Sequence, residues 1–129
     1  MELVDETYRL AALLPQSERF ALTPQLKRAA VSVAANIAEG HGRLSTGDFV
    51  RHLSIARGSL MEVETLYAVA VRVSLIEEAH AACALQLADQ ISRMLATMIR
   101  HLNSNRRPAD PSQPNRNLGA RRSPLAPNS

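Results

Sequence analysis

The chain is poor in aromatic side chains. Of its 129 residues two are Phe, two are Tyr and none is Trp, although 46% are hydrophobic. A core so poor in rings and so rich in Ala, Leu and Val favours helices packed at short distances over a β-sandwich. The length suits one domain with a single core. We therefore expect an all-α protein of one domain.

The chain also has little cysteine and no long apolar run. Cys83 is its single cysteine, so there is no disulfide framework, and a reducing compartment is expected. No run approaches the roughly 20 apolar residues that a membrane-spanning helix needs. The first residues are acidic and amphipathic, unlike a signal peptide. We expect a cytoplasmic protein with no membrane partner, in which Cys83 is a small buried side chain.

Positive charge is concentrated near the C-terminus. Residues 1–103 hold ten Lys and Arg against eleven Asp and Glu, whereas residues 104–129 hold five Arg against one Asp. The latter segment also holds five of the seven prolines and has too few apolar residues to offset the entropy of ordering. The sequence predicts a domain over residues 1–103 and a disordered basic tail over residues 104–129, rich in Pro, Asn, Ser and Arg.

The first half of the domain contains two helical patterns. The first spans residues 2–14 and ends at Pro15. The second is predicted to begin at Thr23, a good N-cap followed by proline, and to run to about Glu39, where glycines stop it. In the connection between them, Phe20 is the one apolar side chain that is expected to seat against the core.

The second half of the domain contains two longer patterns. Ser45 and Asp48 resemble a capping box, and Ser74 is expected to cap the last helix. Each helix has an apolar seam whose members recur at spacings of three and four: Phe49, Leu53, Ala56, Leu60, Val63, Tyr67 and Ala70 in the first, and Ala84, Leu87, Ala88, Ile91, Leu95, Met98 and Leu102 in the second. Gly58 either permits a close helix approach or is a tolerated weakness. Together the four helices predict an antiparallel up-down-up-down four-helix bundle.

Two of these helices have more apolar surface than one core requires. In the second helix, one stripe is formed by Leu26, Ala30, Val33 and Ile37, and a second by Val31, Ala34 and Ala38. The third helix has a second stripe too, formed by Ile55, Leu66, Val69 and Val73. A helix with two apolar faces needs two packing partners, so we expect a further contact surface besides the bundle core.

A polar line runs between the two apolar faces. It consists of Arg28, Ser32, Asn36 and Glu39 on the second helix, with Ser59 and Glu62 on the third. Buried unpaired, such groups cost several kcal/mol. One interpretation is a hydrogen-bonded and ionic network that fixes the register between helices or subunits. The other is that some of these side chains face a pore or groove and contact a ligand.

Catalytic and metal-binding motifs are incomplete. A di-iron bundle needs two Glu-x-x-His motifs, and Glu77 with His80 supplies one. Gly40 and Gly42 follow a helix and precede no Walker lysine, and neither Ser32 nor Ser59 has an evident base. We expect no enzymatic activity, no cofactor and no metal, with His80 at the rim of the core.

Nucleic-acid binding is a further candidate function. The cations that could contact phosphates are Lys27, Arg43, Arg51, Arg57, Arg106 and Arg107. Acidic residues interleave with them, and few aromatic side chains are available for base stacking. Any binding would therefore be to phosphates, weakly sequence-specific and sensitive to salt.

The sequence resembles a known family at specific positions. The motifs that carry the resemblance are the run from Asn36 to Gly40, Gly42-Arg43, and Gly58-Ser59-x-x-Glu62-x-Glu64. They are similar to those of the four-helix bundle proteins encoded by intervening sequences of ribosomal RNA genes, over roughly residues 3–102. The accessory variability protein of diversity-generating retroelements is a related branch.

The resemblance implies a homopentameric ring of four-helix bundles with a central channel and no catalytic activity. It also implies association with RNA or DNA and, in the retroelement branch, a reverse-transcriptase partner. The alternative function is a protein-interaction scaffold that recruits such a partner without binding nucleic acid. The chain departs from the family in having no proline within residues 33–35 and in its short first helix.

Overall fold

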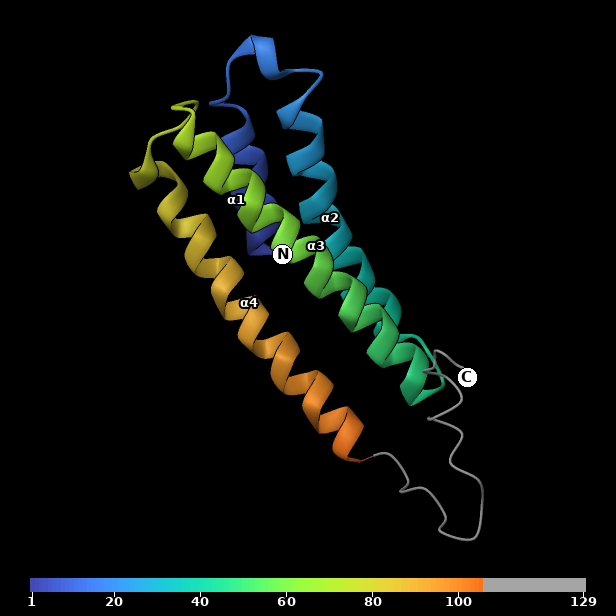
Figure 1. Ribbon diagram of the computed structural model, residues 1–129. Coiled ribbons are helices and arrows are strands. Elements are labelled where there is room, and N and C mark those ends of the chain that lie inside the picture. The colour runs from blue at the N-terminus through green and yellow to red at the C-terminus, as the bar shows by residue number, and fades with distance from the viewer. Residues whose placement is uncertain (106–129) are drawn as a thin grey trace, which may run out of the picture.

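The computed structural model describes residues 1–105, which form an antiparallel up-down-up-down bundle of four helices (Figure 1). The helices are α1 (Glu2–Ala11), α2 (Leu22–His41), α3 (Thr46–Arg72) and α4 (Glu78–Ser104), and the short 3₁₀ helix η1 (Gln16–Glu18) lies between α1 and α2. The predicted fold class is confirmed. The predicted tail lies, from residue 106 on, outside the described residues.

Helix α1 is much shorter than its neighbours. Its 10 residues extend about 15 Å, whereas the 27 residues of α3 and of α4 extend about 40 Å. It packs between α2 and α4, and the N-terminus lies about half-way along the bundle (Figure 1). We call residues 1–30 and 62–87 the four-helix half, and residues 31–61 and 88–105 the three-helix half.

The predicted seam of α3 forms the centre of the core. Six of its seven members are buried, and Phe49 is partly buried at the end of the bundle. Within this core the Tyr67 hydroxyl donates a hydrogen bond to Thr7 Oγ1 over 3.0 Å, and both side chains are fully buried. Burial raises the pKa of Tyr67 to about 12. This bond ties α1 to the helix diagonally across the bundle.

The predicted glycine stop of α2 is confirmed at Gly42 but not at Gly40. Gly40 does not end the helix, which continues to His41 with Gly42 as its C-cap. A Cβ atom on Gly40 would come within 2.8 Å of Phe49 Cδ1 and 3.2 Å of His52 Cβ, so this glycine permits the close approach of α2 and α3. Gly58 has no neighbour within 4 Å of such a Cβ, so it does not permit a close approach within the described chain.

The predicted N-cap of α3, Ser45, is correct, but the predicted N-caps of α2 and α4 are wrong. The Asp48 N–H donates to Ser45 Oγ over 3.0 Å. Helix α2 begins one residue before Thr23, with Ala21 as N-cap and no side-chain bond, because buried Leu22 joins the helix. Ser74 does not cap α4, which has Glu77 as its N-cap; Ser74 instead turns the chain in a left-handed conformation with φ of 63°.

The end of the first helix and the next connection also differ from the prediction. Helix α1 ends at Ala11 rather than at Leu14, because tighter i→i−3 bonds in the next turn direct Leu14 into the core. Phe20 is not seated against the core: it is 87% exposed, and the Arg19 guanidinium lies 5.3 Å from its ring centroid. Cys83 is exposed rather than buried.

Candidate functional site

Charge is separated along the bundle axis. The four-helix half holds eight carboxylates and five Lys or Arg side chains. The three-helix half reverses this balance with three carboxylates and five arginines, to which three histidines are added. The predicted contact residues Arg106 and Arg107 lie outside the described residues, but they follow directly on Asn105 at the end of the three-helix half. Net positive charge is therefore greatest at that end of the molecule.

The structure brings two predicted phosphate contacts together at this end. Arg43 follows the C-cap of α2, and Arg51 lies in the second turn of α3. Each side chain is exposed and lies near a carboxylate. Arg43 Nη2 is 3.6 Å from Glu39 Oε1, and Arg51 Nε is 3.8 Å from Asp48 Oδ1. Such exposed pairs contribute about 0–1 kcal/mol each, so a phosphate group can compete for both guanidinium groups.

Two other predicted contacts lie elsewhere. The Lys27 ammonium lies 4.8 Å from the ring centroid of Tyr8, between α1 and α2 in the four-helix half. Arg57 is exposed but lies six residues beyond Arg51, about 9 Å along α3 and on another face. The sequence reasoning missed Arg100 and His101, which are exposed in the last turns of α4. The antiparallel topology, which places the end of α4 at the same end of the bundle as the α2–α3 turn, was the signal that could have identified them (Figure 1).

Three of the six residues of the predicted polar network are joined by hydrogen bonds. Ser32 Oγ lies 2.8 Å from Ser59 Oγ, which links α2 to α3. The Asn36 side-chain amide donates to the Ser32 carbonyl oxygen over 2.9 Å and to Ser32 Oγ over 3.2 Å. All three side chains are partly buried, so these bonds are shielded from water on one side. The polar line thus forms part of the contact between α2 and α3.

His52 extends this network, and the sequence reasoning missed it. Its side chain is buried, with Nδ1 3.1 Å from Asn36 Oδ1 and 3.8 Å from Glu39 Oε1. Because the Asn36 amide donates to a carbonyl oxygen, its Oδ1 faces His52, and Nδ1 must carry the proton. Nε2 then accepts a hydrogen bond from Arg51 Nη2 over 3.5 Å. In the sequence, His52 directly precedes Leu53 of the buried α3 seam, and this position could have indicated that its side chain lies close to the core.

The remaining network residues lie at its exposed ends. The Glu39 side chain is 62% exposed and faces Arg43 and His52. Arg28 and Glu62 are exposed and form no hydrogen bond or ion pair within residues 1–105. The polar line is therefore a short hydrogen-bonded segment with charged ends.

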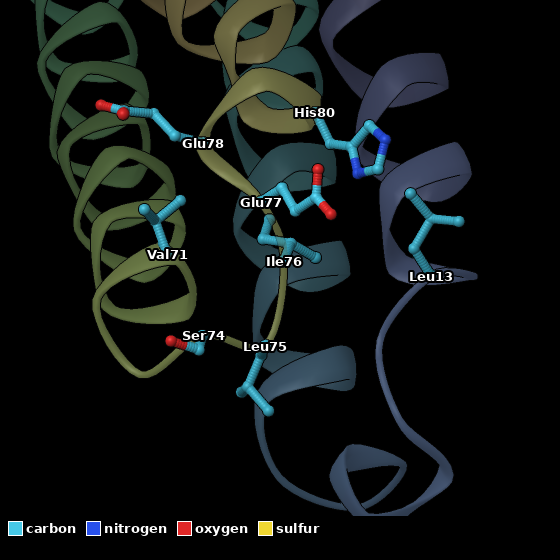
Figure 2. A pocket seen from close by; sticks show the side chains of 8 residues that line it. All are labelled: Leu13, Val71, Ser74, Leu75, Ile76, Glu77, Glu78 and His80. Atoms are coloured by element: carbon cyan, nitrogen blue, oxygen red, sulfur yellow. The ribbon is translucent and has the colours of Figure 1, made fainter.

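A hollow lies at the opposite end of the bundle from Arg43 and Arg51. It measures about 580 Å³ and is lined by Leu13, Val71, Ser74, Leu75, Ile76, Glu77, Glu78 and His80. His80 is exposed at its edge rather than at the rim of the core, and the Glu77 carboxylate points toward its ring (Figure 2). Within residues 1–105, no group of three His, Cys, Asp or Glu side chains could hold a metal ion. No helix of this part is long and apolar enough to cross a membrane.

The described residues thus form an antiparallel four-helix bundle in which side-chain hydrogen bonds join α2 to α3. The chain belongs to the family of 23S rRNA-intervening sequence proteins, whose sequence model matches residues 1–97, and the resemblance described above is confirmed. No curated protein matches the chain.

A solved structure has the same fold. It is the crystal structure of a protein of unknown function from the S23 ribosomal protein family of Bacteroides thetaiotaomicron VPI-5482. The two chains are 24% identical, with a TM-score of 0.72, over 77% of this chain and 93% of the other.

Proposed function

We propose that this protein is a non-enzymatic, oligomeric four-helix bundle that associates with nucleic acid through phosphate contacts. The observation that carries the proposal is the separation of charge along the bundle axis. Arg43, Arg51 and Arg100 lie in the three-helix half, whose net charge is positive. Two further arginines follow Asn105 directly in sequence. A polyanion would be attracted to this end and repelled by the carboxylates of the four-helix half.

Phosphate recognition fits this surface better than base recognition. The aromatic side chain nearest to these arginines, Phe49, is partly buried against His41, with ring centroids 4.9 Å apart. Its partial burial leaves only part of the ring for a base to stack on. Binding is therefore expected to depend on charge, to discriminate weakly between sequences and to weaken as salt is added.

The nucleic acid to test first is a structured RNA, because the family takes its name from intervening sequences of 23S rRNA. The experiment measures the retardation of a structured RNA and of a DNA duplex at 50 mM and 200 mM salt. We expect both to bind at 50 mM and to lose affinity at 200 mM. If neither binds at 50 mM salt, the proposal is wrong.

The oligomeric part of the proposal has its own support. The second apolar stripes of α2 and α3 face solvent in the single chain: Val31, Ile55, Val69 and Val73 are between 41% and 57% exposed. These are the surfaces for which the sequence predicted a second partner, and a second copy of the chain would cover them. The family resemblance proposes a pentamer, and the mass in solution tests it.

The alternative function is a scaffold that recruits a protein such as a reverse transcriptase without binding nucleic acid. The features that favour it are Phe20 and Leu44, which are almost fully exposed in the two connections at opposite ends of the bundle. Co-purification of a neighbouring gene's product after nuclease treatment, together with no retardation of RNA or DNA, would favour the scaffold.

A further inference from the structure

Leu44 is a fully exposed apolar side chain in the turn between α2 and α3. Hydrogen bonds hold the chain on both sides of it. The Arg43 N–H donates to the Gly40 carbonyl oxygen over 3.1 Å. The Asp48 N–H donates to Ser45 Oγ over 3.0 Å. The turn therefore presents Leu44 to solvent at one end of the bundle, and Arg43 precedes it directly in the sequence (Figure 1).

The hollow at the opposite end of the bundle is partly apolar (Figure 2). Four of its eight lining residues are apolar, namely Leu13, Val71, Leu75 and Ile76. Leu13 is 48% exposed, and Val71 and Leu75 are partly exposed, so apolar surface of the hollow is open to solvent. The volume of about 580 Å³ is within the range of roughly 300–1,000 Å³ for sites that hold small molecules. A leucine side chain therefore fits within the hollow.

The end of α3 fixes the shape of this hollow. The Leu75 N–H donates to the Ala70 carbonyl oxygen over 2.8 Å. The Ser74 N–H donates to the Val71 carbonyl oxygen over 3.0 Å. These two bonds form a Schellman motif, in which Ser74 takes the left-handed position with φ of 63°. Because Val71, Ser74 and Leu75 all line the hollow, its shape is present before a partner binds.

The turn and the hollow are also complementary in charge. Glu77 and Glu78 line the hollow, and neither carboxylate forms an ion pair within residues 1–105. At the other end of the bundle, Arg43 is exposed and its pair with Glu39 is weak. An Arg43 side chain that approaches the hollow would therefore meet two carboxylates. Opposite charges on two surfaces of this kind favour their association.

We propose that the α2–α3 turn of one copy of this chain docks into the hollow of a second copy. Leu44 then contacts the apolar walls, and Arg43 lies beside Glu77 and Glu78. The two surfaces lie at opposite ends of the bundle, so a chain cannot make this contact with itself (Figure 1). Because two different surfaces meet, the contact joins copies head to tail, in a row or in a closed ring.

This end contact is weaker than the proposed side contact through the apolar stripes of α2 and α3. It buries one leucine side chain and pairs charges that salt can screen. We expect it in concentrated protein at low salt, and not in the dilute protein whose mass reports the side contact. It requires no nucleic acid, so its test is independent of the phosphate-binding proposal.

Sedimentation velocity of the full chain, over a range of protein concentrations and without nucleic acid, tests the end contact. At 50 mM salt the sedimentation coefficient of the wild type should rise with concentration, and at 200 mM salt it should rise less. Leu44→Ser and Arg43→Glu should each remove most of the rise. Arg57→Glu is the matched control, because it reverses the charge of an exposed arginine on another face of α3, and it should retain the rise.

A mixture of two variants separates docking from a loss of folding. Glu77→Lys/Glu78→Lys should not associate with itself, because its hollow and its turn are both positive. Mixed with Arg43→Glu it should associate again, because the reversed charges attract, and misfolded variants could not restore the contact. The proposal is overturned if the wild type shows no rise, if Arg43→Glu and Arg57→Glu behave alike, or if the mixture associates no more than its components. A hollow that takes a basic segment of a different protein would give the first of these results.

Discussion

The side chains of Asn36 and His52 meet across α2 and α3, with Oδ1 3.1 Å from Nδ1. About one helical turn away, Ser32 and Ser59 form a second link between the same helices at 2.8 Å. Asn36 joins the two links through its bonds to Ser32. The register of α2 against α3 is thus specified by directional bonds as well as by the fit of apolar side chains.

Replacement of Asn36 by Ala should lower the free energy of unfolding by about 1–3 kcal/mol, because it leaves the Nδ1–H of buried His52 without its acceptor. Urea unfolding monitored by circular dichroism measures the loss. Glu39→Ala is the control, since Glu39 is largely exposed and its ion pairs are weak; a change within about 0.5 kcal/mol is expected. Equal losses in both variants would contradict this account of the network.

Two glycines in helices should respond in opposite ways to alanine. Gly40→Ala should destabilise by about 1–3 kcal/mol, because the new Cβ would lie 2.8 Å from Phe49 Cδ1. Gly58→Ala should stabilise by about 0.5–1 kcal/mol, because the site is open and alanine favours the helix. Thermal unfolding of the two variants makes the comparison. A Gly40→Ala protein as stable as the wild type would show that the helices do not approach so closely.

Stability should decrease at alkaline pH because of Tyr67. Its pKa is raised from 10 to about 12, so the folded state favours the neutral phenol. The stabilisation is fully present below pH 10 and is lost as the pH rises from 10 toward 12, by up to about 2–3 kcal/mol. Unfolding in urea at pH 8 to 12 measures it. Tyr67→Phe should lack this loss while exposed Tyr8→Phe retains it; a loss in Tyr67→Phe equal to that of the wild type would contradict the assignment.

The exposed apolar stripes provide a test of assembly. Val31→Glu and Ile55→Glu each place a charge on a surface that we propose a second copy covers, so each should lower the mass in solution, measured by light scattering. Both side chains are more than 40% exposed, so the fold of the single chain should persist. Leu13→Glu, at an exposed position of similar burial after α1, is the control and should keep the wild-type mass. A mass unchanged in all three variants would contradict this placement of the interface.

The sequence predicted the fold better than it predicted which apolar side chains are exposed. Spacings of three and four identified the α3 seam from Leu53 to Ala70, because a buried stripe must repeat with the helical period. The same spacings could not show how much of the 27-residue α4 the 10-residue α1 covers, or that Met94 is 45% exposed. Periodicity shows which face of a helix is apolar, but the lengths of neighbouring elements determine what covers it.

The candidate site was predicted in part, for a similar reason. Ser32, Asn36 and Ser59 were identified because polar side chains interrupted apolar faces. His52 was missed because its role depends on the direction of its side chain toward Asn36, which a linear pattern does not give. Arg100 was missed although the predicted antiparallel arrangement already brings the end of α4 to the end of the bundle where Arg43 lies.

The most direct test of the phosphate-binding proposal is the salt dependence of the affinity for a structured RNA, measured by fluorescence anisotropy between 50 and 200 mM salt. Arg43→Ala/Arg51→Ala should weaken binding and reduce the slope of log K against log salt by about 1–2, because about one counterion is released per phosphate contact. Arg19→Ala/Arg72→Ala removes the same charge from the four-helix half and should leave that slope near the wild-type value. Equal slopes for the two variants, or a wild-type affinity that does not change with salt, would contradict the account.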